Sequence, residues 1–133
     1  MALHMIKLCV GCDTVEDLQA WHADARDPWT MRTRQTPKRV AEMVRGGSLY
    51  RVFKGMILCR QAILDIATVG EGANARCEVT LDRTVVRVAP TPRRAFQGWR
   101  YLEPRDAPPD LAGDLAADIP TELARQLREL GAW

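Results

Sequence analysis

The stretch SLYRVFKGMILCRQAILDIATV, residues 48–69, consists of two runs rich in residues that favour β-strands, joined near Gly55. Valine, isoleucine, tyrosine and phenylalanine suit the pleated, half-buried surface of a sheet. A glycine between two such runs is typical of a turn. We therefore expect SLYRVFKG and MILCRQAILDI to form adjacent strands.

Further strands are predicted on both sides of this stretch. LHMIKLCVG (3–11) is typical of a buried strand, and a short closing strand is expected near Trp99–Leu102. ARCEVTLD (75–82) and RTVVRVAP (83–90) have the composition of a hairpin with a turn near Asp82. Few strands alternate with helices in the second half, so the sheet should be mostly antiparallel. Consecutive short strands favour a small bent or closed β-barrel, because closure removes exposed edges.

Three helices are predicted to flank these strands. The first begins at a capping residue, Asp13 or Thr14, and carries apolar residues at helical spacing. The second begins where Thr36 precedes Pro37 and ends at the two glycines of positions 46–47. The third is amphipathic and lies at the C-terminal end. The predicted fold class is therefore α+β.

The chain of 133 residues is long enough to bury the core of one domain. Its apolar fraction of 47% and charged fraction of 27% are ordinary for a globular protein. We expect the barrel to occupy residues 1–111, with the last helix, in residues 112–133, packed on the same domain. The start MALHMIKLCVGCD lacks the pattern of a signal peptide, and no apolar run is long enough to span a membrane. The prediction is a soluble cytoplasmic protein with no membrane partner.

Cys9 and Cys12 have the spacing of a zinc knuckle or of a thiol-redox pair. Cys59 and Cys77 do not form a second such pair, and Cys9 falls in a predicted buried strand. A zinc site would need ligands from the remaining cysteines and the two histidines, so metal and redox roles stay alternatives. We predict free thiols in a reducing compartment, with no metal and no cofactor.

Residues that could carry catalysis are sparse. Ser48 has no obvious partner histidine, and GEGANA (70–75) lacks the lysine and the following helix of a phosphate-binding loop. The sequence alone therefore does not support catalysis.

Charge is unevenly distributed, although the net charge is only +2. Eight basic residues lie between Arg32 and Arg60 against one acid, Glu42, and further arginines follow up to Arg100. Both ends of the chain are acidic. This distribution favours one electropositive face and a polyanionic partner. The alternative is a solvated surface whose arginines pair with acidic helices.

Arginine and aromatic residues occur together in TPKR (36–39), GGSLYRVFKG (46–55) and PRRAFQGWRY (92–101). Arginine binds phosphate through two parallel hydrogen bonds, and aromatic rings offer faces on which bases stack. The alternative is that these aromatic residues belong to the core. We expect most of them to be buried, Phe96 included.

Three stretches resemble the signature blocks of one family: HMIKLCVGCDTVEDLQAW (4–21), TPKRVAEMVRGGSLYRVFKGMILCRQAILDI (36–66) and PTPRRAFQGWRYLEPRDAPPDL (90–111). The family is catalogued as domain of unknown function 1489 and is found mainly in alphaproteobacteria. The resemblance covers about residues 4–111 and leaves the last helix outside. Because the family has no established activity, it implies little about function.

A helix, two glycines, a LYRVFKG strand and a strand ending in ILDI are also similar to the barrels of the pseudouridine-synthase-and-archaeosine-transglycosylase (PUA-like) superfamily. That superfamily includes the EVE, YTH and ASCH domains. The resemblance implies a small β-barrel with flanking helices that binds RNA or a modified base in a cleft. Here the cleft would be bounded by the helix at 37–45, the strand at 50–54 and the loop at 93–99.

We therefore predict an RNA- or nucleotide-binding module with a basic cleft and an aromatic platform. The predicted binding residues are Lys38, Arg39, Tyr50, Lys54, Arg93, Arg94 and Trp99. Lys38 and the arginines would hold phosphate, and Trp99 or Tyr50 would stack on a base. One alternative is a small ASCH-like hydrolase that acts on a nucleoside or an amide with Lys54 and Asp65. Another is a protein-interaction module that binds through the acidic C-terminal helix.

Overall fold

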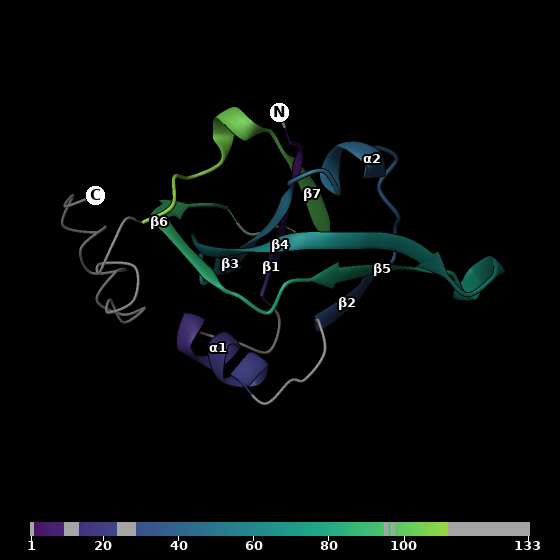
Figure 1. The fold of residues 1–133 in the computed structure, drawn as a ribbon, viewed down its shortest axis with the longest axis horizontal. Coiled ribbons are helices and arrows are strands. Elements are labelled where there is room, and N and C mark those ends of the chain that lie inside the picture. The colour runs from purple at the N-terminus through teal and green to yellow at the C-terminus, as the bar shows by residue number, and fades with distance from the viewer. Residues whose placement is uncertain (1, 10–13, 24–28, 95, 97, 112–133) are drawn as a thin grey trace.

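The computed structural model describes residues 2–9, 14–23, 29–94, 96 and 98–111. Within these residues the protein is a mixed sheet of seven strands with two short helices (Figure 1). The strands are β1 (His4–Leu8), β2 (Trp29–Thr33), β3 (Ser48–Phe53), β4 (Met56–Val69), β5 (Arg76–Leu81), β6 (Val86–Pro92) and β7 (Trp99–Leu102). The helices are α1 (Val15–Ala23) and α2 (Val40–Met43), and single helical turns lie at Gly72–Asn74 and Pro104–Asp106. The predicted C-terminal helix and Cys12 lie outside the described residues.

The β3–β4 hairpin confirms the prediction made from residues 48–69. The two strands are antiparallel, from Ser48 opposite Ala62 to Phe53 opposite Met56. Lys54 and Gly55 form the turn with φ angles of 48° and 85°. Positive φ at both central residues matches the right-handed twist of hairpin strands. Glycine adopts such angles freely, whereas Lys54 is an uncommon residue in this region.

The predicted hairpin of residues 75–90 is wrong in its pairing, although both strands exist. β5 and β6 do not pair with each other but lie end to end along one edge of β4, whose other edge pairs with β3. The reversal occurs instead between β4 and β5, where Gly70 has φ 82°. The predicted turn at Asp82 is local: the Asp82 carboxylate accepts the backbone N–H of Thr84 at 2.9 Å and interrupts the strand.

The sheet is open and is not closed into a barrel, which corrects the predicted barrel. Its strand order is β2-β5-β4-β3-β1-β7, with β6 also paired to β4. Only β1 and β3 are parallel among the described pairs, so the sheet is mostly antiparallel, as expected. β2 and β7 stand at the two ends of this order and do not pair, although the segment after β2 contacts β7: Gln35 accepts a hydrogen bond from the Trp99 indole. The described elements are mostly β rather than α+β.

The two described helices are short, and one differs from its prediction. α1 begins as expected after Thr14, whose hydroxyl accepts the backbone N–H of Asp17 at 3.1 Å. α2 has four residues and begins at Val40, not at Pro37. Thr36 does not cap it, because its hydroxyl is bonded to that of Thr68 at 2.7 Å. No helix among the described residues is long and apolar enough to cross a membrane.

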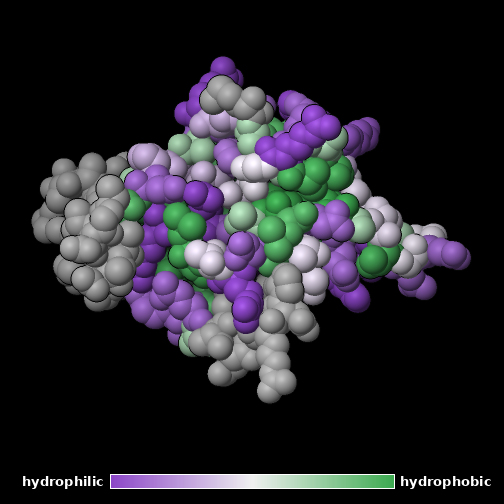
Figure 2. Space-filling view, viewed as in Figure 1, coloured by the Kyte–Doolittle hydropathy of each residue, from purple (hydrophilic) through white to green (hydrophobic). Residues whose placement is uncertain are grey.

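Apolar clusters cover both faces of the sheet. On one face α1 packs against the sheet, with Val15 and Leu18 beside Phe53 and Cys59. On the opposite face Ala107 packs against a cluster that includes Tyr50. In Figure 1, α1 and the Pro104–Asp106 turn accordingly lie on opposite sides of the strands. Figure 2 shows hydrophilic side chains projecting at the top of the molecule, with apolar side chains gathered over the middle.

An ion pair between Arg60 and Asp110 ties the segment after β7 to the sheet. The Arg60 Nε and Nη2 atoms donate to the two Asp110 carboxylate oxygens at 2.8 and 2.7 Å. A third Arg60 nitrogen donates to the Ser48 hydroxyl at 2.9 Å. The hydrogen bonds from Arg60 hold the pKa of Asp110 below its ordinary value.

His4 is fixed beside this ion pair. Its Nδ1 atom accepts the backbone N–H of Ser48 at 3.0 Å, so the neutral ring carries its proton on Nε2. The ring meets Tyr50 edge-on, with centroids 5.1 Å apart. Burial, and then the positive charge of Arg60, lower the pKa of His4 below its ordinary value.

We predict that Asp110→Asn lowers the free energy of unfolding by about 0.5–1 kcal/mol at pH 7, because both partners are partly exposed and water screens the pair. Since the folded-state pKa of Asp110 is depressed, its contribution is present above about pH 4 and is lost as the pH falls through the folded pKa. Urea unfolding at pH 7 and about pH 2 measures this. An equal difference between wild type and variant at both pH values would refute the ion-pair account.

We predict a second pH effect from His4. Its pKa is lower in the folded state than in the unfolded state, so the unfolded chain binds more protons as the pH falls below about 6.5. Stability should decrease by at most about 1.4 kcal/mol per pH unit for this one group. His4→Asn keeps a hydrogen-bond acceptor but does not titrate. Urea unfolding between pH 7 and 5 should therefore give a shallower pH slope for the variant, and identical slopes would contradict the prediction.

Candidate nucleic-acid interface

β7 is an edge strand, and its alternating side chains point to the two faces of the sheet. Trp99 and Tyr101 lie opposite Lys7 and Met5 of β1, whereas Arg100 lies opposite Ile6. Successive strand residues face opposite sides. The strand therefore presents two aromatic rings on one face and a cation on the other.

The two rings are held by the segment between β2 and α2. The Trp99 indole nitrogen donates to the carbonyl oxygen of Gln35 at 2.8 Å. The Tyr101 hydroxyl accepts the backbone N–H groups of Lys38 at 3.0 Å and Arg39 at 3.4 Å. The rings meet edge to face, with centroids 4.9 Å apart. Trp99 is partly covered by the core, whereas Tyr101 is 36% exposed, with the Arg39 guanidinium 5.8 Å from the centroid of its ring.

A third ring, Phe96, lies between two arginines on the other side of β7. The guanidinium carbons of Arg93 and Arg100 are 5.6 and 5.5 Å from its centroid, within cation–π range. Phe96 is half-buried rather than buried as predicted, and it packs against the core beside Leu8. The backbone N–H of Arg93 donates to the carbonyl oxygen of Gly55 at 2.8 Å, which fixes the start of this loop to the β3–β4 turn.

Three open hollows along β7 share residues and form one continuous surface. The first, of about 330 Å³, is lined by Arg93, Arg94 and Phe96 and shares Arg100 with the second. The second and third, of about 530 Å³ each, share Gln35 and Trp99. We call the set the β7 surface; it consists of Arg34, Lys38, Arg93, Arg94, Phe96, Trp99, Arg100 and Tyr101.

The β7 surface carries positive charge that the described residues do not neutralise. Arg34, Lys38, Arg93 and Arg94 are exposed, and none forms an ion pair with a carboxylate in the part of the chain that the structure describes. The arginines that do form ion pairs lie elsewhere: Arg32, Arg39, Arg60 and Arg87.

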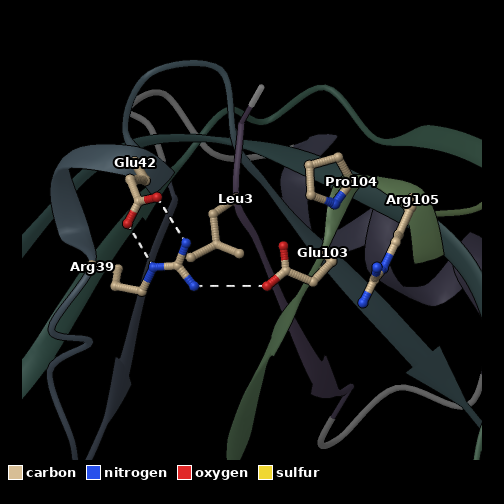
Figure 3. Close-up of a pocket in the computed structure, with 6 residues that line it drawn as sticks. All are labelled: Leu3, Arg39, Glu42, Glu103, Pro104 and Arg105. Carbon is tan, nitrogen blue, oxygen red and sulfur yellow. Dashed lines mark hydrogen bonds and ion pairs between the residues drawn. The ribbon is translucent and has the colours of Figure 1, made fainter.

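Arg39 was predicted to hold phosphate, but two carboxylates neutralise it. Its guanidinium donates to Glu42 at 2.6 and 2.8 Å and lies 3.7 Å from Glu103. The hydrogen bond between Arg39 and Glu42 raises the pKa of the arginine and lowers that of the acid. These residues line a pocket of about 460 Å³ beside Leu3, where Figure 3 shows Arg39 between the two acids. The pocket is charge-balanced and is a poor site for phosphate.

The other predicted site residues lie in two places. Tyr50 is 4% exposed and packs in the core, so its ring has no open face for a base. Lys54 is exposed in the β3–β4 turn, next to the Arg93 end of the β7 surface. Asp65, the partner of Lys54 in the hydrolase alternative, lies nine residues beyond the start of β4 at Met56. Nine residues of strand span about 30 Å. The described fold therefore does not bring Lys54 and Asp65 together.

The prediction missed Arg34, Arg100 and Tyr101 as members of this surface. Arg100 and Tyr101 stand in the GWRYL segment beside the predicted Trp99. The signal available in the sequence was strand alternation, which places Tyr101 on the same face as Trp99.

The described cysteines, Cys9, Cys59 and Cys77, are buried in the two clusters of the α1 face. Among the described residues, no three side chains of histidine, cysteine, aspartate or glutamate are grouped closely enough to hold a metal ion.

No curated protein and no solved structure matches the chain, so the resemblance to PUA-like barrels finds no support in these comparisons. One family model matches, over residues 5–133, and its description is a protein of unknown function, DUF1489. The match extends beyond the blocks recognised in the sequence and includes the C-terminal residues. The chain therefore belongs to the DUF1489 family.

Proposed function

We propose that the protein is a cytoplasmic RNA- or nucleotide-binding module whose ligand lies along the β7 surface. One observation supports this most strongly: four exposed cations without a carboxylate partner among the described residues adjoin three aromatic rings in one continuous surface. The alternative, a surface whose arginines pair with acids, describes Arg32 with Glu78 but none of these four cations within the described residues.

Each type of residue on the β7 surface suits a different part of a nucleotide. Arginines donate two hydrogen bonds to phosphate oxygens, and lysine adds a compact charge. Aromatic faces stack on bases without strong sequence preference. In this proposal Arg34, Lys38, Arg93 and Arg94 hold phosphates, and the more exposed ring of Tyr101 stacks on a base.

The scaffold beneath these residues is well suited to present them. Pro90 and Pro92 lie in β6 directly before the arginine loop and restrict the backbone there. Arg93 is attached to the β3–β4 turn through its backbone, which leaves its side chain available to solvent. Less conformational entropy is then lost when Arg93 and Arg94 bind a ligand together.

We predict that Arg93→Ala with Arg94→Ala weakens binding of a fluorescent single-stranded oligouridine and lowers the slope of log K against log salt by up to about two. The thermal midpoint should change little, because exposed arginines contribute roughly 0–1 kcal/mol. Fluorescence anisotropy at several salt concentrations measures the slope.

The matched control is Arg45→Ala with Arg83→Ala, which removes two exposed charges outside the β7 surface. If the control and the test variant lose affinity equally, net charge alone determines binding. If the test variant binds as wild type does, the proposed site is wrong.

We predict that Tyr101→Ala weakens oligouridine binding by roughly 5- to 150-fold, the effect of losing about 1–3 kcal/mol of base stacking. Tyr101→Phe loses the same hydrogen bonds to Lys38 and Arg39 but keeps the ring, so its affinity should stay within about twofold of wild type. Equal losses in both variants would show that the hydroxyl, rather than stacking, matters.

Polyglutamate as a competitor tests for an acidic protein partner instead. It needs the cations but not the ring, so Tyr101→Ala should leave its binding unchanged. If Tyr101→Ala weakens polyglutamate and oligouridine equally, the claim of base recognition fails.

A further inference from the structure

A second group of cations lies on the α1 face of the sheet, beside the β7 surface, since Lys7 is the register partner of Trp99. Lys7, Arg51, Cys59 and Arg87 occupy directly opposed positions on β1, β3, β4 and β6. Directly opposed residues share a face of the sheet. Cys59 packs against residues of α1, which identifies the face.

Arg51 is buried without a counter-charge among the described residues. It is 6% exposed, and its Nε atom donates to the Gln61 amide oxygen at 3.1 Å. Its two terminal nitrogens have no hydrogen-bond partner within the described residues, and no described carboxylate forms an ion pair with it. Burying a charged group without a partner costs several kcal/mol in proteins. Within the described residues, the Arg51 guanidinium therefore has no anion that neutralises its charge.

Lys7 adds a second positive charge next to Arg51. The two residues are register partners on parallel strands, and Lys7 is half-buried. Burial, and then the charge of Arg51, lower the pKa of Lys7 below its ordinary value. Adjacent like charges repel in a partly desolvated site, and a bound anion would remove this repulsion.

Two described acids on neighbouring elements, Glu16 and Asp82, already accept hydrogen bonds. Glu16 of α1 accepts a hydrogen bond from Arg87 at 2.8 Å. The Asp82 carboxylate accepts the backbone N–H of Thr84. The backbone carbonyl oxygen of Asp82 accepts a hydrogen bond from the Gln61 side-chain amide at 3.1 Å. This second bond orients Gln61, whose oxygen in turn fixes the plane of the Arg51 guanidinium.

We propose that Lys7 and Arg51, oriented by Gln61, form a binding site for one small tetrahedral oxyanion of the phosphate class. The two terminal nitrogens of Arg51 match two oxygens of such an ion, and Lys7 supplies a third donor. Apolar clusters flank the pair on the same face, and a low local dielectric strengthens these bonds. Because Arg51 is only 6% exposed, a nucleic-acid backbone could not reach its guanidinium, which restricts the proposed ligand to a small ion. The site does not depend on the function proposed for the β7 surface.

The test uses inorganic phosphate as the probe. Equilibrium dialysis against labelled phosphate, in sodium chloride that keeps the ionic strength constant, should show one equivalent bound to the wild-type protein. Phosphate should also raise the thermal midpoint by several degrees, because it binds the folded state only. Lys7→Met and Arg51→Gln should each weaken phosphate binding at least tenfold and lose this rise.

Two controls separate this site from the β7 surface. Arg93→Ala with Arg94→Ala should bind phosphate as wild type does, and Lys7→Met should bind oligouridine as wild type does. In chloride alone Lys7→Met should be at least as stable as wild type, since it removes a repulsion. If Arg51→Gln does not fold, Lys7→Met alone tests the proposal. The side chain of Lys7 is only half-buried, so this variant should fold.

Three results would overturn the proposal. They are no binding of phosphate by the wild-type protein beyond the chloride control, wild-type phosphate binding by Lys7→Met, and loss of phosphate binding in the Arg93 and Arg94 variant. The last result would move the phosphate to the β7 surface.

Discussion

Backbone hydrogen bonding on both edges of β4 determines where the other described strands lie. Its fourteen residues pair with β3 on one edge and with β6 and β5, end to end, on the other. A shift of one residue in either register would turn every side chain of β4 to the other face of the sheet. β1 and β7 are then added on the β3 side. β7 therefore becomes the edge that carries the rings and arginines at the surface.

The parts of the fold that depend on local sequence could be predicted, and those that depend on distant pairing could not. The β3–β4 hairpin follows from two strand-forming runs around Gly55, and the start of α1 follows from the Thr14 cap. The turn at Asp82 is also real as a local structure. Whether β5 and β6 pair with each other or with β4 depends on the length of β4. Likewise, α2 is shorter than predicted because Thr36 bonds Thr68, far away in sequence.

The same distinction applies to the candidate site. The charges of Lys38, Arg93 and Arg94 could be predicted, since arginine and lysine rarely stay buried without partners. The role of an aromatic ring could not, because Tyr50 and Tyr101 have the same chemistry. Tyr50 lies on a strand paired on both edges and is 4% exposed, whereas Tyr101 lies on the edge strand and is 36% exposed. Exposure alone does not make a binding residue either: Arg39 is exposed, but the neighbouring acids Glu42 and Glu103 neutralise its charge.

The charges along β7 also address a structural problem. An edge strand presents backbone groups that can pair with another chain, and charged side chains on the edge oppose such pairing. Arg100 stands within β7 itself, while Arg34, Arg93 and Arg94 line the hollows beside it. Positive charge at this edge therefore disfavours pairing with a second copy of the same strand and favours an anion. The pair of half-buried Lys7 and buried Arg51 has no such protective role, because both residues lie on strands that are paired on both edges. Its charge is thus explained less well by solubility than by a bound ion.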